Sequence, residues 1–316
     1  MSLYILRRAL LLFPVMFGVS LLVFFSIRLV PGDITDALSQ SSESFTPQQA
    51  QVYRHQLGLD RPAVTQYGVW VSKLVRGDLG KSFYDKQPVS RGIISAIPVS
   101  LELAIMAVVI GTALAIPLGV ISALRQDKWE DYIGRLFSIF GMSVPDFVLG
   151  TLFIVLPSIW FHWVPPITYA PFFDDPATNL KQFFLPALVL GLRSSASIMR
   201  ITRSSMLEVL RSDYVRTAWA KGLPQRMVIV RHALKNAMVA PITVIGTQIG
   251  FLMGGTVIVE QIFSLPGLGK LTLDSILVRD YAQLQGNVIF LATIFVVVNL
   301  LVDLSYAWFD PRIRYS

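Results

Sequence analysis

Long apolar runs that contain no charged residue restrict the fold of this chain more than any other feature. The three clearest runs are Leu103 to Leu124, Asn236 to Val259 and Tyr281 to Val302. As a helix, each is long enough to cross the roughly 30 Å of a bilayer's hydrocarbon core. A fourth run, from Ala9 to Ile27, follows two arginines, but it is too long for a signal peptide and lacks a small-residue cleavage site. We interpret it as a retained membrane anchor.

Two weaker runs complete the predicted set. One extends from about Ile133 to Trp163 and is interrupted by Asp146, and the other extends from about Phe184 to Ser204 and is interrupted by Arg193 and Arg200. With both included, six crossings place every short segment rich in Lys and Arg on one face of the membrane, as the positive-inside rule requires. The sequence therefore predicts an all-α integral membrane protein with six transmembrane helices and cytoplasmic N and C termini.

Composition agrees with this class. Hydrophobic residues make up 53% of the 316 residues, charged residues 15%, and the mean hydropathy is +0.59, which is too apolar for a soluble protein of this length. The net charge of +7 comes from basic residues that flank the apolar runs, so no nucleic-acid partner is predicted. The chain has no cysteine, and its three histidines are far apart in sequence, so no metal site is predicted.

Three regions follow from the positions of these runs. Residues 1–30 form the N-terminal tail and first transmembrane helix, 31–97 an external helical loop, and 98–316 a core of five transmembrane helices. In the external loop, Thr46, Pro47 and Gln49 predict a capping box, and Gly58 predicts the end of that helix. A second helix is expected from Pro62 toward Leu74.

A strongly basic cytoplasmic loop, residues 205–235 of the core, contains a short predicted helix. Ser212 is expected to cap it, Asp213 and Lys221 to match the helix dipole at its two ends, and Gly222 to end it. Pro224 is then expected at the first position of the next helix. A helix of about nine residues is too short to be stable alone in water, so we expect it to dock against a partner. A basic helix lying on anionic lipid is the alternative.

Small residues recur every four positions in the apolar run from Asn236 to Val259. Gly246, Gly250 and Gly254 share one helical face, and Thr247 and Gln248 add uncharged polar groups beside it. This strip is expected either to line a transport passage or subunit seam, or to provide ordinary helix packing within the subunit.

Two ionisable residues fall inside the weaker runs. At 1.5 Å per residue, Asp146 and Arg193 reach similar depths in two straight spans, so we expect them to pair, directly or across a subunit boundary. The alternative is that each faces a water-filled cavity alone. Arg28, Glu102 and Glu260 are at span ends, where their side chains are expected to reach the membrane interface.

No catalytic site is predicted. The segment from Phe263 to Lys270 does not fit a phosphate-binding loop, because Ser264 and Leu271 occupy positions that require glycine and Ser or Thr. No combination of nucleophile and base, or of two carboxylates, is brought together by the spans. The chain is therefore expected not to be an enzyme.

Several strings, in order along nearly the whole chain, resemble one known family. They are Ile5-Leu6-Arg7-Arg8, Val30-Pro31-Gly32-Asp33, Leu57-Gly58-Leu59-Asp60-Arg61-Pro62, Gly77-Asp78-Leu79-Gly80, Asp213-Tyr214-Val215-Arg216-Thr217-Ala218, His232-Ala233-Leu234-Lys235-Asn236, Leu265-Pro266-Gly267-Leu268-Gly269 and Asp310-Pro311-Arg312. The chain thus resembles the permease subunits of bacterial ABC importers for dipeptides, oligopeptides and nickel, specifically the subunit with a long first external loop.

The resemblance implies a type I importer permease of the bacterial inner membrane. Its implied partners are a second homologous permease, two ATP-binding subunits that hold ATP and Mg, an extracytoplasmic substrate-binding protein and membrane lipid; no cofactor is bound by this chain. The implied ATPase-docking residues are Asp213, Tyr214, Arg216, Thr217, Ala218, Lys221 and Gly222. Substrate identity stays open among peptides, nickel and other small solutes. The alternative function is a stand-alone secondary transporter or channel driven by an ion gradient.

Overall fold

The computed structural model describes residues 2–29, 35 and 47–309, and within them every regular element is helical. In chain order the longer helices are α1 (Ser2–Leu29), α3 (Pro47–Leu57), α4 (Ala63–Val75), α5 (Val89–Leu124), α6 (Trp129–Ser143), α7 (Asp146–Phe161), α8 (Pro176–Leu210), α9 (Asp213–Ala220), α12 (Val239–Gly255), α14 (Leu268–Leu277) and α15 (Tyr281–Phe309). Short segments fill the gaps: α10 (Gln225–Met227), the π-helix η1 (Val228–Leu234), α11 (Lys235–Ala237) and α13 (Val257–Ile262). The expected all-α fold is confirmed.

Four helices are long and apolar enough to cross a membrane: Leu12–Leu29 within α1, all of α5 and α8, and Tyr281–Leu301 within α15. Two bent pairs pass the same test together, α6 with α7 at 100° and residues 225–237 with α12 at 51°. Counting each bent pair as one crossing gives six, which is consistent with the predicted number.

The span expected from about Ile133 to Trp163 is nevertheless not a single helix, because it is divided into α6 and α7. Val144 has an extended backbone, and Pro145 precedes α7, because the residue before a proline is disfavoured in the helical region. The expected fifth span, from Asn236 to Val259, is also divided, with α12 ending at Gly255 and α13 starting at Val257. Treating each of these runs as one straight helix therefore missed the bend before α7 and the break before α13.

Contacts divide the chain into two units. One contains Met1–Val99 and Pro266–Val297, and the other contains Ser100–Leu265 and Val298–Ile313. The predicted helices of the external loop belong to the first unit: α3 ends at Leu57 before Gly58, whose φ is +67°, and α4 covers the expected second helix. Thr46 of the predicted capping box lies outside the described residues.

Within the first unit, α4 packs against the last turns of α1. The Tyr67 hydroxyl lies 2.9 Å from the Ser20 hydroxyl, and the rings of Tyr67 and Trp70 lie 5.2 and 5.6 Å from the ring of Phe24. Near the start of α15, the carboxylate of buried Asp280 accepts a hydrogen bond from the Ser82 hydroxyl at 2.5 Å. This bond ties the segment before α5 to the segment that opens α15.

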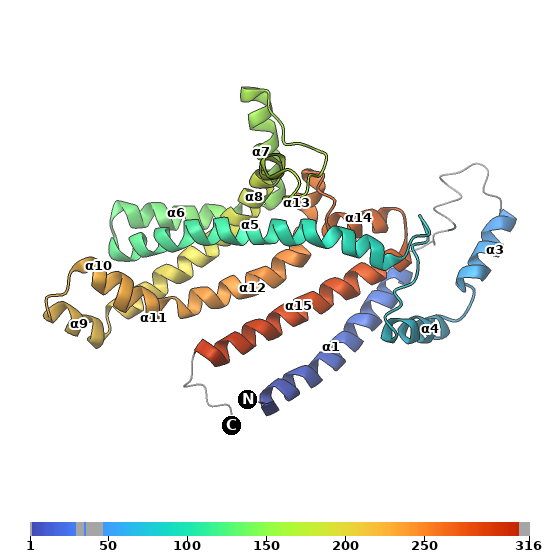
Figure 1. The fold of residues 1–316 in the computed structure, drawn as a ribbon, viewed down its shortest axis with the longest axis horizontal. Coiled ribbons are helices and arrows are strands. Elements are labelled where there is room, and N and C mark those ends of the chain that lie inside the picture. The colour runs from blue at the N-terminus through green and yellow to red at the C-terminus, as the bar shows by residue number, and fades with distance from the viewer. Residues whose placement is uncertain (1, 30–34, 36–46, 310–316) are drawn as a thin grey trace. The chain divides into compact units, whose positions relative to one another are not determined.

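Within the second unit, α6 and the part of α5 from Ser100 onward lie side by side with α8 (Figure 1). Glycines permit the close approach. A Cβ added at Gly111 would lie 3.0 Å from the carbonyl oxygen of Gly191, and one added at Gly119 would lie 2.7 Å from the Cβ of Thr202. Since a side chain at either position would collide with the neighbouring helix, these glycines set the spacing between α5 and α8.

Candidate functional site

The predicted docking helix is present as α9, and it has two different faces. Val215 and Ala218, three residues apart, are buried and pack with Val228 of η1 in a small apolar cluster. Residues three apart lie on the same side of a helix, so this pair forms the inner face. The short helix therefore gains its stability from packing on its own chain, in addition to any partner.

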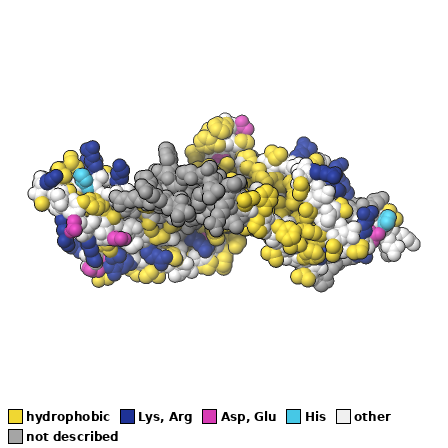
Figure 2. All heavy atoms as spheres, turned by 90° about the horizontal axis from the view of Figure 1, so that it is seen from below, with side chains coloured by type: hydrophobic (Ala, Val, Ile, Leu, Met, Phe, Trp, Pro, Cys, Tyr) yellow, Lys and Arg dark blue, Asp and Glu magenta, His cyan; other side chains and the backbone are white. Residues whose placement is uncertain are grey.

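The outer face of α9 is polar and exposed. Six of the seven predicted docking residues are exposed, namely Asp213, Tyr214, Arg216, Thr217, Lys221 and Gly222, whereas Ala218 faces inward. Tyr214 and Trp219 expose 45% and 43% of their surfaces, which leaves two large aromatic side chains available for contact. Lys and Arg side chains gather at the end of the unit that carries α9, α10 and η1 (Figure 2).

Local chemistry explains where α9 ends, and it corrects two expectations about its surroundings. Gly222 has φ +72°, and its amide donates to the carbonyl of Trp219 at 2.9 Å, a left-handed helix end as predicted. Ser212 precedes the helix, but its hydroxyl donates to the carbonyl of Val209 and makes no cap bond. Pro224 precedes α10 and is not its first residue, so the next helix begins one position later than expected.

A second contact fixes α9 to the helix that follows it. The side-chain amide of Asn236 donates to the Tyr214 hydroxyl at 3.0 Å and to the carbonyl of His232, also at 3.0 Å. Between these segments η1 is a π-helix, a wider turn that occurs often at functional sites. The docking loop is thus one packed element from α9 to α11.

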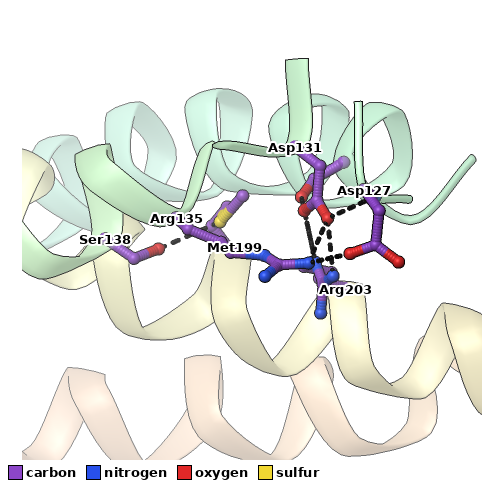
Figure 3. Close-up of polar contacts among 7 residues, drawn as sticks. Asp127, Asp131, Arg135, Ser138, Met199 and Arg203 are labelled. Atoms are coloured by element: carbon purple, nitrogen blue, oxygen red, sulfur yellow. Dashed lines mark hydrogen bonds and ion pairs between the residues drawn. The ribbon is translucent and has the colours of Figure 1, made fainter. Parts of the chain in front are cut away.

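An ionic cluster includes Arg203 of α8, the helix that leads into α9 (Figure 3). Asp131 of α6 is fully buried and receives Nε and Nη2 of Arg203, from α8, at 2.6 and 2.7 Å. Arg135 donates to the same carboxylate at 2.5 Å, and the hydroxyl of Ser122, from α5, also donates to it. The backbone amide of Asp127 adds another bond at 3.0 Å.

This cluster joins α5, α6 and α8 through one carboxylate, and the sequence analysis did not identify it. A buried carboxylate is stable only when paired, and two guanidinium groups supply the pairing here. The sequence held a partial signal, since Asp131 and Arg135 are four residues apart on one helix face. Nothing in the sequence indicated Arg203, which is remote from both.

Asp146 and Arg193 lie together in the structure: Nη1 of Arg193 is 2.7 Å from Oδ2 of Asp146. The side chain of Asp146 is 15% exposed and that of Arg193 is 52% exposed. The depth argument that led to this pair is wrong, because it treated residues 133–163 as one straight span, whereas Asp146 is the first residue of α7 after a 100° bend.

The glycine strip of α12 is not uniform. Gly250 is buried, Gly246 is half-buried and Gly254 is exposed, with nothing within 4 Å of a Cβ added at Gly254. Gln248 beside them is half-buried, and Thr247 is exposed. Gly254, at one end of the strip, therefore has open space beside it in the described chain, whereas Gly250 in its middle is packed.

Glu260 differs from its predicted place at a membrane interface. It is fully buried, and its Oε1 accepts hydrogen bonds from the hydroxyls of Ser100 and Thr256, both at 2.7 Å. The break between α12 and α13 turns this side chain inward, a feature that the unbroken apolar sequence did not reveal. Within residues 2–29, 35 and 47–309, no group of three or more His, Cys, Asp or Glu side chains could hold a metal ion.

Comparison with known proteins gives matches over nearly the whole chain. Residues 115–315 match the family described as binding-protein-dependent transport system inner membrane component, and residues 1–104 match the N-terminal region of such membrane components. A protein of Brucella abortus, provisionally named a peptide transport system permease protein, is 41% identical over 316 residues, with full coverage of both chains.

Two further relatives cover 99% of this chain and of their own length. The dipeptide transport system permease protein of Alkalihalophilus pseudofirmus is 38% identical over 332 aligned residues, and the glutathione transport system permease protein of Escherichia coli K12 is 36% identical over 313. With its several apolar helices, the chain is a multi-pass protein of the inner membrane. It belongs to the family of binding-protein-dependent transport system inner membrane components.

Proposed function

We propose that this chain is the permease subunit of an ATP-driven ABC importer and forms half of its transmembrane pathway. The observation that carries the proposal is the two-faced α9: its inner face is packed on the chain by Val215 and Ala218, and its outer face is polar and exposed. A helix built in this way can transmit force from a docked partner, because it is fixed to the permease on one side and accessible on the other.

The proposed partners are a second homologous permease, two ATP-binding subunits that hold ATP and Mg, and an extracytoplasmic binding protein. ATP changes the conformation of the ATP-binding subunits, and α9 is proposed to move with them. Such coupling requires that ATP favour one position of α9 over another, since a ligand shifts an equilibrium only by its difference in affinity for the two states.

Movement of α9 has a defined route into the membrane helices. The Asn236 to Tyr214 bond links α9 to α11, and α8 ends only two residues before α9 begins. Arg203 of α8 is in turn held by Asp131 of α6. A displacement of the docking loop would therefore be carried to α6 and α8 through bonded and packed contacts rather than through a flexible linker.

The proposed substrates are short peptides. The relatives named above include permeases for dipeptides and for glutathione, which is itself a tripeptide. The polar, uncharged Thr247 and Gln248 and the exposed Gly254 of α12 are proposed to face the pathway. Groups without net charge suit a passage that must release its cargo.

The absence of cysteine from the sequence permits a direct test of docking. In the complex coexpressed with its ATP-binding subunits, Thr217→Cys introduces the only thiol of this chain on the outer face of α9. We expect a short thiol-to-amine cross-linker to join this position to an ATP-binding subunit. Lys181→Cys, on the exposed first turns of α8, is the matched control and should give no such product.

Transport itself is tested in liposomes that contain the assembled complex and the binding protein. Uptake of a labelled dipeptide should require ATP and both ATP-binding subunits. Uptake that continues without those subunits and follows an imposed ion gradient would refute the proposal, as would the absence of any Thr217→Cys product with an ATP-binding subunit.

A further inference from the structure

A basic pocket in the first unit lies outside the site described above. It has a volume of about 640 Å³ and is lined by parts of α1, α4, the segment 78–86 and the start of α15. Among the lining residues that the structure describes, five are Arg or Lys, and Asp78 is the single acidic one. The five are Arg28, Arg61, Lys73, Lys81 and Lys86. This imbalance gives the pocket a positive potential that favours an anion.

The carboxylates in and near the pocket offset only part of the charge of its five cations, and each of them is also bound to other groups of the chain. Oδ1 of Asp78 accepts the amide of Gly80 at 2.9 Å. Asp60 is paired with His55 at 2.7 Å. Asp280, just before α15, is buried and accepts bonds from Ser82 and from the amide of Phe83.

One buried donor in the pocket has no partner. Gln285 of α15 is 5% exposed and lines the pocket, and its Nε2 is buried without a hydrogen-bond acceptor. An unsatisfied buried donor carries a free-energy cost that a bound oxygen would remove. A neutral amide donor next to several cations is the arrangement expected in a site that binds an oxyanion.

The position of Arg28 is fixed before any ligand binds. Its Nη1 donates to the carbonyl of Phe24 at 2.9 Å, its Nη2 donates to Oε1 of Gln66 at 2.5 Å, and its guanidinium carbon lies 3.5 Å from the centre of the Phe24 ring. A preorganised arginine binds an anion with less loss of conformational freedom than a mobile one. The pocket therefore has one fixed cation and several exposed lysines around it.

The surroundings indicate the source of the anion. Arg28 is at the end of the apolar span Leu12–Leu29, where a membrane helix meets the lipid headgroups. α4 packs there with Tyr67 and Trp70, aromatic residues typical of the interface, and leaves Val64 and Val75 75% and 82% exposed. A helix with exposed valines and a lysine-bearing side suits the boundary between acyl chains and headgroups.

We propose that this pocket binds the phosphate group of an anionic lipid headgroup, with Arg28, Arg61, Lys73 and the amide of Gln285 as its principal donors. The chemistry recognised is a phosphate oxyanion, and a free phosphate compound is the other possible source. The proposal does not depend on the transport activity inferred above, since it concerns a different unit of the chain.

The first experiment uses the intact complex in nanodiscs made from equal amounts of phosphatidylglycerol and phosphatidylcholine. After detergent extraction, the lipid retained by the complex is quantified by mass spectrometry. We expect the wild type to retain phosphatidylglycerol in preference to phosphatidylcholine. In the double variant Arg61→Gln with Lys73→Gln, the ratio of retained phosphatidylglycerol to phosphatidylcholine should fall about fivefold for each charge removed. Equal retention by the double variant and the wild type would overturn the proposal.

Arg91→Gln is the matched control, because Arg91 is an exposed arginine of the same unit that does not line the pocket and is held by Gln87 at 3.1 Å. It should retain lipid as the wild type does. A loss as large as that of the double variant would show that general surface charge, not the pocket, holds the lipid, and would also overturn the proposal.

A second measurement needs no variant. Acetylation of Lys73 and Lys81 in the wild-type complex is compared in phosphatidylcholine discs with and without phosphatidylglycerol or added glycerol phosphate. Protection by phosphatidylglycerol alone identifies the lipid as the source, and equal protection by glycerol phosphate identifies a free phosphate compound. Protection that appears only when the binding protein is added, with neither phosphate effective, would assign the pocket to a protein partner and refute phosphate binding.

Discussion

The carboxylate of Asp131 is held by both Nε and Nη2 of Arg203, at 2.6 and 2.7 Å, although the two residues are 72 positions apart in the sequence. Breaking a buried ion pair leaves an uncompensated charge and is strongly destabilising. Arg203→Gln should therefore lower the free energy of unfolding by about 3 kcal/mol, toward the smaller end of the usual range, because Arg135 still faces the carboxylate.

The thermal unfolding midpoint of the detergent-solubilised complex measures this effect. Adding Asp131→Asn to Arg203→Gln should recover part of the loss, since the double variant no longer buries an unpaired charge. An unchanged midpoint in Arg203→Gln would contradict the account of this cluster as the joint between α5, α6 and α8.

Gly222→Ala should weaken the end of α9. A residue with a Cβ costs about 1 kcal/mol or more in the left-handed region, and Gly222 has φ +72°. We expect lower ATP-dependent uptake with little change in assembly of the complex. Gly68→Ala is the control, because it lies in α4 with no atom within 4 Å of an added Cβ and should leave the unfolding midpoint unchanged or slightly higher. Equal uptake by both variants would argue against α9 as the docking element.

Gly119→Ala should separate α5 from α8. The added Cβ would lie 2.7 Å from the Cβ of Thr202 and 2.8 Å from the carbonyl oxygen of Met199, so backbone must move. Overpacking of this kind costs about 1 to 3 kcal/mol. Gly68→Ala in α4, where a Cβ meets nothing within 4 Å, should show no such loss in the same unfolding assay.

The pair of Asp146 and Arg193 should contribute little to stability. Arg193 is 52% exposed, and exposed ion pairs contribute about 0 to 1 kcal/mol. A double-mutant cycle with Asp146→Asn and Arg193→Gln, read by thermal unfolding, should give a coupling energy within about 1 kcal/mol. If these variants lose dipeptide uptake while the thermal unfolding midpoint stays nearly unchanged, the pair has a role in the transport cycle. A coupling energy above about 3 kcal/mol would mean that the pair is buried in the assembled complex.

Asp175 caps the start of α8 and should make that helix end sensitive to acid. A hydrogen bond with the side chain of Thr178 and one from the backbone amide of Thr178, at 3.1 Å from Oδ1, lower the pKa of the Asp175 carboxyl below its ordinary value of 3.8. The folded protein therefore favours the ionised carboxylate, so the stabilisation is complete above the ordinary pKa and is lost as pH falls through the lowered one. The difference in unfolding midpoint between the wild type and Asp175→Ala should be largest near neutrality and should shrink in acid. A difference that grows on acidification would contradict the direction of the shift.

Features set by local chemistry were predictable from the sequence. The end of α3 at Gly58 and the end of α9 at Gly222 both follow from glycine's access to positive φ, which needs only the neighbouring residues. The membrane class followed from uncharged runs long enough to cross a bilayer. In each case the deciding residues are contiguous.

Features that depend on distant residues were not predictable. Hydropathy was unbroken through Thr256, so the break before α13 was not visible in the sequence. The bend before α7 was missed for another reason: Pro145 indicates it locally, but the run on both sides was interpreted as one span. The burial of Glu260 depends on Ser100, 160 positions away, and the pairing of Asp131 depends on Arg203. Only the three-dimensional packing of α5 with α13, and of α6 with α8, brings these partners together.

The length of α5 has a consequence for how the protein meets its surroundings. Its 36 residues extend about 54 Å, whereas the hydrocarbon layer is about 30 Å thick, so no plausible tilt can hide the whole helix in lipid. At least one end must emerge into water or headgroups, and the sequence places Ser90 and Arg91 at its first turn. One continuous helix thus extends from the hydrocarbon interior of the bilayer into the headgroup layer or the water beyond it, so part of its surface meets a polar environment at any tilt.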